Sequence, residues 1–136
     1  MRVEPYLSFE GRGDEAIELY KNAVGAKVLM LMRFKDAPEQ MSGTHGADVA
    51  NKVMHARLKM GDSVVMLSDG RCTGKAAFTG IALSLTLKTE AEAERCFAAL
   101  SEGGTVTMPL AKTFFSPKFG MVQDKFGVGW MVIVEH

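Results

Sequence analysis

The chain has 136 residues and a formal net charge of zero, with sixteen basic and sixteen acidic side chains. This length suits one compact domain, which we expect to span residues 1–136. The balanced charge provides no basic field for nucleic acid or an anionic membrane surface, so we predict neither as a partner.

Targeting signals and cysteines bear on where in the cell the protein is expected to work. The longest apolar run, residues 130–134 with their neighbours, is too short to span a bilayer, and the N-terminus lacks the apolar stretch of a signal peptide. Cys72 and Cys96 have neither metal-ligand spacing nor a disulfide framework. We therefore interpret them as reduced thiols and predict a cytoplasmic protein.

The first half of the chain predicts a strand, a helix and three further strands. Strands are expected within residues 5–10 and 28–34 and in both halves of 52–69. Apolar residues at helical spacing predict a helix in 14–27, with Asp14 as N-cap and Gly25 as its stop. A tight turn at Gly61-Asp62 joins the last two strands, because glycine tolerates a positive φ.

The second half predicts the same elements in the same order. Strands are expected within residues 81–88 and 105–110 and in both halves of 118–135. Thr89 and Glu92 form a capping box at the start of a helix that ends at Gly103-Gly104. Pro109 favours an edge position for its strand, because proline cannot donate a backbone hydrogen bond.

The repeated order indicates a duplication, with repeat one at about 1–69 and repeat two at about 80–136. Each helix has one apolar face and must cover one side of a sheet. We therefore predict an α+β fold in which two βαβββ repeats form a curved, mixed eight-stranded sheet with helices on its outer face. The opposite face is expected to form a cleft.

The stretches "PYLSFEGRGDEAIELYKNAVGAKV", "KVMHARLKMGDSVVMLSD" and "GGTVTMPLAKTFFSPKFGMVQDKFGVGWMV" carry a resemblance. Together with the duplication, they resemble the PhnB-like branch of the vicinal oxygen chelate (VOC) superfamily, which contains glyoxalases, ring-cleaving dioxygenases and bleomycin-resistance proteins. The resemblance spans essentially the whole chain and implies a homodimer of unassigned activity. Some members carry a ubiquinone methyltransferase label, but we find no glycine-rich strand-to-helix turn suited to S-adenosylmethionine.

Metal-using members of the superfamily place four His, Glu or Gln ligands on strands of the two repeats. Carried over to this chain, the first position falls at or near Glu4, which is able to ligate. The other positions are occupied by Val64, Met66 or Ser68, by Gly80, and by Met131 or Ile133. A single ligand does not hold a divalent ion, so we predict no metal and no cofactor. A displaced metal site using Glu4 and His55 stays open as an alternative.

His55 and Arg57 lie on one predicted strand. Strand alternation places the apolar residues of this stretch on one face and these two on the other. The apolar residues are Met54, Ala56, Leu58 and Met60. His55 is then either a hydrogen-bonded strand histidine without chemistry or, with Arg57, a contact for an anionic or carbonyl substrate.

The final predicted hairpin combines glycine, aromatic residues and an aspartate. Asp124 and Gly127 frame its turn, where we expect Asp124 to hold the turn's shape rather than to act as a general base. Trp130 and Met131 alternate, so one packs on a helix and the other faces the cleft. Phe119 belongs to an aromatic cluster that either closes the core or lines the cleft.

These observations predict a protein that binds a small, apolar or mildly anionic metabolite in the cleft without a tightly bound metal. The expected lining residues are Tyr6, His55, Arg57, Phe119 and Met131. No catalytic residue is assigned, and whether the chain is an enzyme stays open. The alternatives are a metal-dependent glyoxalase- or dioxygenase-type enzyme and a sequestering protein of the bleomycin-resistance type. Residues 36–51 are interpreted as a lid, a dimer contact or a disordered loop.

Overall fold

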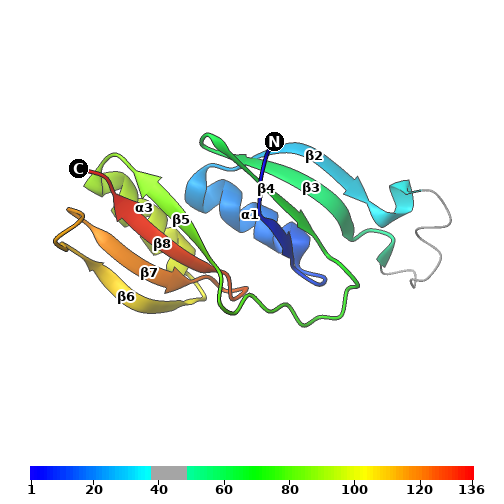
Figure 1. Cartoon of the computed structure of the whole chain (residues 1–136). Coiled ribbons are helices and arrows are strands. Elements are labelled where there is room, and N and C mark those ends of the chain that lie inside the picture. Colours follow the sequence, from blue (N-terminus) through cyan, green and yellow to red (C-terminus); the bar gives the residue numbers. More distant parts are fainter. Residues whose placement is uncertain (38–48) are drawn as a thin grey trace. The chain divides into compact units, whose positions relative to one another are not determined.

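The computed structural model describes residues 1–37 and 49–136 of the chain. It divides into two compact units, Met1–Ala76 and Ala77–His136, each of which contains one of the predicted repeats (Figure 1). The three interpretations of residues 36–51 fall largely on 38–48, which lie outside the described residues.

The first unit contains a four-stranded mixed sheet and one long helix. Its elements are β1 (Tyr6–Ser8), α1 (Gly13–Val24), β2 (Lys27–Arg33), the short 3-10 helix η1 (Phe34–Asp36), β3 (Val53–Met60) and β4 (Ser63–Ser68). The strand order is β1-β4-β3-β2. β1 pairs with β4 in parallel, whereas β3 is antiparallel to both of its neighbours.

The second unit repeats this topology. Its elements are β5 (Ala82–Leu87), α3 (Glu90–Ser101), β6 (Thr105–Ala111), β7 (Phe119–Gln123) and β8 (Gly129–Val134). The strand order is β5-β8-β7-β6, with β5 parallel to β8. The predicted α+β duplication of βαβββ repeats is therefore confirmed, with the eight strands arranged as two sheets of four. β6, which contains Pro109, is an edge strand as predicted.

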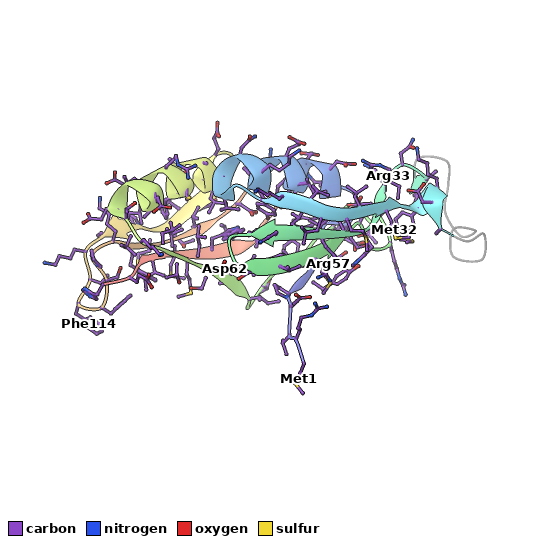
Figure 2. All side chains as sticks on the ribbon, turned by 90° about the horizontal axis from the view of Figure 1, so that it is seen from above. Met1, Met32, Arg33, Arg57, Asp62 and Phe114 are labelled. Atoms are coloured by element: carbon purple, nitrogen blue, oxygen red, sulfur yellow. The ribbon has the colours of Figure 1, made fainter. Side chains whose placement is uncertain are left out.

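Each helix packs its apolar stripe on one face of the sheet of its own unit. In Figure 2, α1 lies on one side of strands β2 to β4. The buried helix residues Ala16 and Tyr20 share the core of the first unit with the fully buried strand residues Leu58 and Leu67. The opposite face of each sheet is left uncovered by the helix of its unit.

The start of α1 differs from the prediction. Its N-cap is Arg12, which makes no capping bond, and Asp14 instead pairs with Arg33 at 3.0 Å. The capping role belongs to Asp69, whose Oδ1 accepts from the N–H of Gly13 at 2.7 Å. The helix ends at Gly25 as predicted, with the left-handed φ of 67° that glycine tolerates.

Thr89 caps the start of α3 as predicted, whereas the Glu92 side chain bonds to the Thr89 hydroxyl and not to its backbone N–H. The Thr89 hydroxyl accepts from the Glu92 N–H at 3.1 Å, and the Glu92 carboxylate accepts from the Thr89 hydroxyl at 3.0 Å. Cys72 and Cys96 are both free thiols. Within residues 1–37 and 49–136, no helix combines the length and the apolar character needed to cross a membrane.

Candidate functional site

The uncovered face of the first sheet carries a group of polar and thioether side chains. Register places Tyr6 opposite Met66, Met66 opposite Arg57, and Arg57 opposite Met30, so these four form a row across the sheet. His55 pairs with Met32 in the adjoining row. We call the following set the site face: Tyr6, Met30, Met32, His55, Arg57 and Met66.

The alternation predicted for β3 is present at its centre. Ala56 and Leu58 are fully buried, whereas His55 and Arg57 lie on the other face and keep part of their surface exposed. Figure 2 labels Arg57 on the side of the strands away from α1. The sheet thus separates a closed apolar core from a face that has polar groups available for a ligand.

Tyr6 and His55 form a direct pair on the site face. The Tyr6 hydroxyl lies 2.8 Å from His55 Nδ1, and the two rings stack with their centroids 5.5 Å apart. Partial burial raises the pKa of the Tyr6 phenol, and a hydrogen bond with Ser68 offsets part of that effect. Tyr6 therefore stays a neutral hydroxyl at neutral pH. The pair uses Nδ1 of the imidazole, which leaves Nε2 as the ring atom available to a ligand.

Arg57 is a partly buried cation that forms a loose ion pair with Glu4. Its Nη1 lies 3.6 Å from Glu4 Oε1 and 3.6 Å from Met66 Sδ, while only 23% of the side chain is exposed. The first distance is longer than a hydrogen bond, and a thioether is a weak acceptor. Within the described chain, therefore, the five guanidinium N–H groups meet no oxygen at hydrogen-bond distance.

The other two predicted lining residues lie on the second sheet. Phe119 pairs with Ile133, and Met131 pairs with Met121, on the face away from the buried Trp130. Phe119 is itself buried, because Phe115 packs against it edge-on with ring centroids 5.0 Å apart. Their participation in a site with Tyr6, His55 and Arg57 stays a prediction.

Asp124 organises the turn between β7 and β8. Its buried carboxylate accepts from the N–H groups of Phe126 at 2.9 Å and Val128 at 3.1 Å, and from Trp130 Nε1 at 2.9 Å. Gly127 adopts a φ of 94° in the same turn. A carboxylate with three donors already in place has a structural role rather than that of a general base.

A displaced metal site would need at least three converging ligands. The described residues contain no group of three or more His, Cys, Asp or Glu side chains placed to hold an ion. Glu4 lies beside Arg57, and His55 contacts Tyr6. The alternative based on Glu4 and His55 thus lacks a third ligand in the part of the chain that the structure describes.

The sequence reading overlooked a glycine-containing turn between β1 and α1, at Gly11-Arg12-Gly13. Such a turn resembles an anion-binding helix start, where backbone N–H groups point at a ligand. Here Asp69 Oδ1 accepts from Gly11 N at 3.0 Å and from Gly13 N at 2.7 Å. These donors are occupied by the protein's own carboxylate.

The family comparison agrees with this architecture. The family model described as 3-demethylubiquinone-9 3-methyltransferase matches residues 1–133. The chain belongs to this family. It is 35% identical to Protein YjdN of Escherichia coli (strain K12), in an alignment that covers 98% of this chain and 95% of that protein.

Two solved structures are similar to the chain over nearly its whole length. Protein PA1353 from Pseudomonas aeruginosa superposes with a TM-score of 0.85 at 40% identity, covering 99% of this chain and 98% of that one. A Bacillus cereus protein described as a putative 3-demethylubiquinone-9 3-methyltransferase, PhnB protein, superposes with a TM-score of 0.80 at 26% identity, covering 98% and 99%. This is the PhnB-like family that the sequence resembled.

The wider fold is glyoxalase-like. A glyoxylase/bleomycin resistance protein/dioxygenase domain from Frankia sp. EAN1pec matches at 14% identity with a TM-score of 0.64, covering 99% of this chain and 95% of that one, and shares the fold. The chain therefore has the glyoxalase-like fold that the sequence predicted.

Sequence reasoning missed several members of the site. Met30 and Met32 occupy alternate positions of β2, so their common face was readable from the sequence. The approach of Glu4 to Arg57 had no comparable signal, because 52 residues separate the two in the chain and strand pairing alone brings them together.

Proposed function

We propose that this PhnB-like protein binds a small metabolite on the site face and that it does so without a tightly bound metal. The observation that supports this proposal is Arg57. Its partly exposed guanidinium has N–H groups open to a ligand, and a guanidinium matches a carboxylate or phosphate with two parallel bonds. Within the described residues, Arg57 makes no such pair of hydrogen bonds to an oxygen.

The surroundings of Arg57 suit a ligand that also has an apolar part. Met66 lies beside Arg57 on one side of its row and Met30 on the other. Methionine side chains are flexible and polarisable, and they adapt to apolar ligands of varied shape. The Tyr6–His55 pair contributes a hydroxyl and an imidazole within the same face.

Methyl transfer, which the family description names, gains no support from the β1–α1 turn. The N–H groups of Gly11 and Gly13 are engaged by Asp69 and are not available to a cofactor there. We therefore propose metabolite binding rather than methyl transfer.

Replacing Arg57 with alanine tests the location of the site. A panel of small carboxylates, phosphates and carbonyl compounds is screened by thermal shift, and hits are titrated by calorimetry. For a hit, Arg57→Ala is expected to weaken binding at least about ten-fold, since hydrogen bonds to a charged group contribute roughly 1.5–3 kcal/mol each. The melting temperature without ligand should change little, because Arg57 makes no strong internal bond.

Lys59→Ala is the matched control, because Lys59 is an exposed cation two residues further along the same strand. It should leave binding within about two-fold, as expected for a screened surface charge. Unchanged affinity in Arg57→Ala would place the ligand elsewhere, and a large fall in its melting temperature would make Arg57 part of the scaffold. Analysis of the released compound distinguishes binding from turnover.

We also propose that the protein is a homodimer. The edge strand β2 exposes Val28, Leu29 and Met30, and the edge strand β6 exposes Val106 and Met108. Edge strands with exposed apolar residues favour pairing with another chain. Light scattering coupled to size-exclusion chromatography is expected to give twice the monomer mass, and Leu29→Lys should shift the protein towards monomer. A monomeric mass at micromolar concentration would contradict the proposal.

A further inference from the structure

At the border of the site face, Arg57 forms a loose ion pair with Glu4, a residue just outside that set. Glu4 precedes β1, and its side chain is only 16% exposed. Oε1 lies 3.6 Å from Arg57 Nη1, and Oε2 lies 3.9 Å from Nε of the exposed Arg2. Neither contact is a hydrogen bond, so in the described chain the Glu4 carboxylate and the Arg57 guanidinium both keep capacity for a ligand.

This pair constrains the charge of what binds. A simple anion on Arg57 would bring a second negative charge next to the Glu4 carboxylate, and a simple cation on Glu4 would meet the Arg57 guanidinium. Repulsion between like charges is stronger where protein excludes water than in bulk solvent. A ligand that carries both charges satisfies both groups and leaves the Glu4–Arg57 contact in place.

The short separation of the two charges restricts the ligand further. Glu4 Oε1 and Arg57 Nη1 are 3.6 Å apart. In an α-amino acid a single carbon separates the ammonium from the carboxylate, so its two charges lie at a comparable distance and pair head to tail with those of the protein. Ligands with widely separated charges do not match this spacing.

We propose that the ligand is a zwitterion of the α-amino acid class with an apolar side chain. Its carboxylate accepts from the guanidinium of Arg57, and its ammonium donates to the carboxylate of Glu4. The apolar side chain contacts the thioethers of Met30 and Met66, which flank Arg57 in the row. This inference rests on the proposed function and names the class of its ligand.

Analogues that lack one of the two charged groups test the contribution of each charge to binding. L-leucine and L-phenylalanine are titrated into the whole protein by calorimetry. Each is compared with the analogue that lacks the amino group (4-methylpentanoate, 3-phenylpropanoate) and with the analogue that lacks the carboxylate (3-methylbutylamine, 2-phenylethylamine). At least one amino acid is expected to bind ten-fold or more tightly than both of its analogues.

Glu4→Gln tests the ammonium contact in the protein. It is expected to weaken amino-acid binding at least ten-fold and to leave the amino-free analogue unchanged or bound more tightly. Glu18→Gln on the exposed face of α1 is the control and should alter neither affinity. Melting temperatures of both variants show whether the fold is retained.

Three outcomes would overturn the inference. The first is an amino-free analogue that binds as tightly as the amino acid, which would make the ligand a simple anion. The second is a Glu4→Gln variant with unchanged amino-acid affinity. The third is that neither amino acid binds. If a compound from the wider panel then binds in an Arg57-dependent way, the proposed function is retained and only the zwitterion class is wrong.

Discussion

Replacing Asp69 with alanine is expected to lower the free energy of unfolding of the first unit by about 4 kcal/mol. Asp69 is fully buried, and its carboxylate accepts from the N–H groups of Gly11 at 3.0 Å, Gly13 at 2.7 Å and Val53 at 2.8 Å. The substitution leaves these donors without their acceptor. It also removes the group that joins the start of α1 to the start of β3. Urea unfolding followed by far-ultraviolet circular dichroism measures the loss.

Asp14→Ala is the control for Asp69→Ala. Asp14 lies in the first turn of α1, where sequence alone placed the cap, and it pairs with Arg33 at an exposed position. Its replacement should cost no more than about 1 kcal/mol, as is usual for a surface ion pair. Equal losses in the two variants would show that Asp69 does not hold the two elements together.

Replacing Asp124 with alanine is expected to destabilise the second unit by about 3 kcal/mol. The buried carboxylate of Asp124 holds two backbone N–H groups of its own turn and the indole N–H of Trp130. Loss of the carboxylate removes the bonds that shape the turn and leaves the indole without this acceptor. Because Trp130 is the only tryptophan, its fluorescence reports the change directly.

Asp62→Ala tests whether any aspartate at a hairpin turn would behave in the same way. Asp62 lies in the turn between β3 and β4, where its side chain is exposed. We expect a change within about 0.5 kcal/mol, typical of surface substitutions. If Asp124→Ala leaves both the urea midpoint and the emission maximum of Trp130 unchanged, the assignment of Asp124 as the organiser of its turn is wrong.

Periodicity was sufficient to predict the elements because it depends on local geometry. Apolar residues of α3 recur at helical spacing, and Ala93, Cys96 and Leu100 of this stripe are buried. The alternation in β3 likewise put His55 and Arg57 on the face opposite Ala56 and Leu58. Two halves with the same order of elements then implied the same strand order in each unit.

The candidate site was predictable only in part. Residue types and alternation were enough to nominate Tyr6, His55 and Arg57, which lie on the same uncovered face. The methionines that flank Arg57 required the register of β2 and β4 against β3. A register cannot be read from one strand, because it depends on which residues of two strands come to lie opposite each other.

The sequence by itself therefore determined the duplicated βαβββ order, the edge position of Pro109, the capped start of α3 and the faces of the strands. Tertiary structure decided that Asp69, rather than Asp14, caps α1, and that Glu4 lies beside Arg57. The physical reason is the range of the interactions. Propensity, periodicity and caps act within a few residues, whereas these carboxylates reach groups more than fifty residues away and are placed there by the pairing of strands.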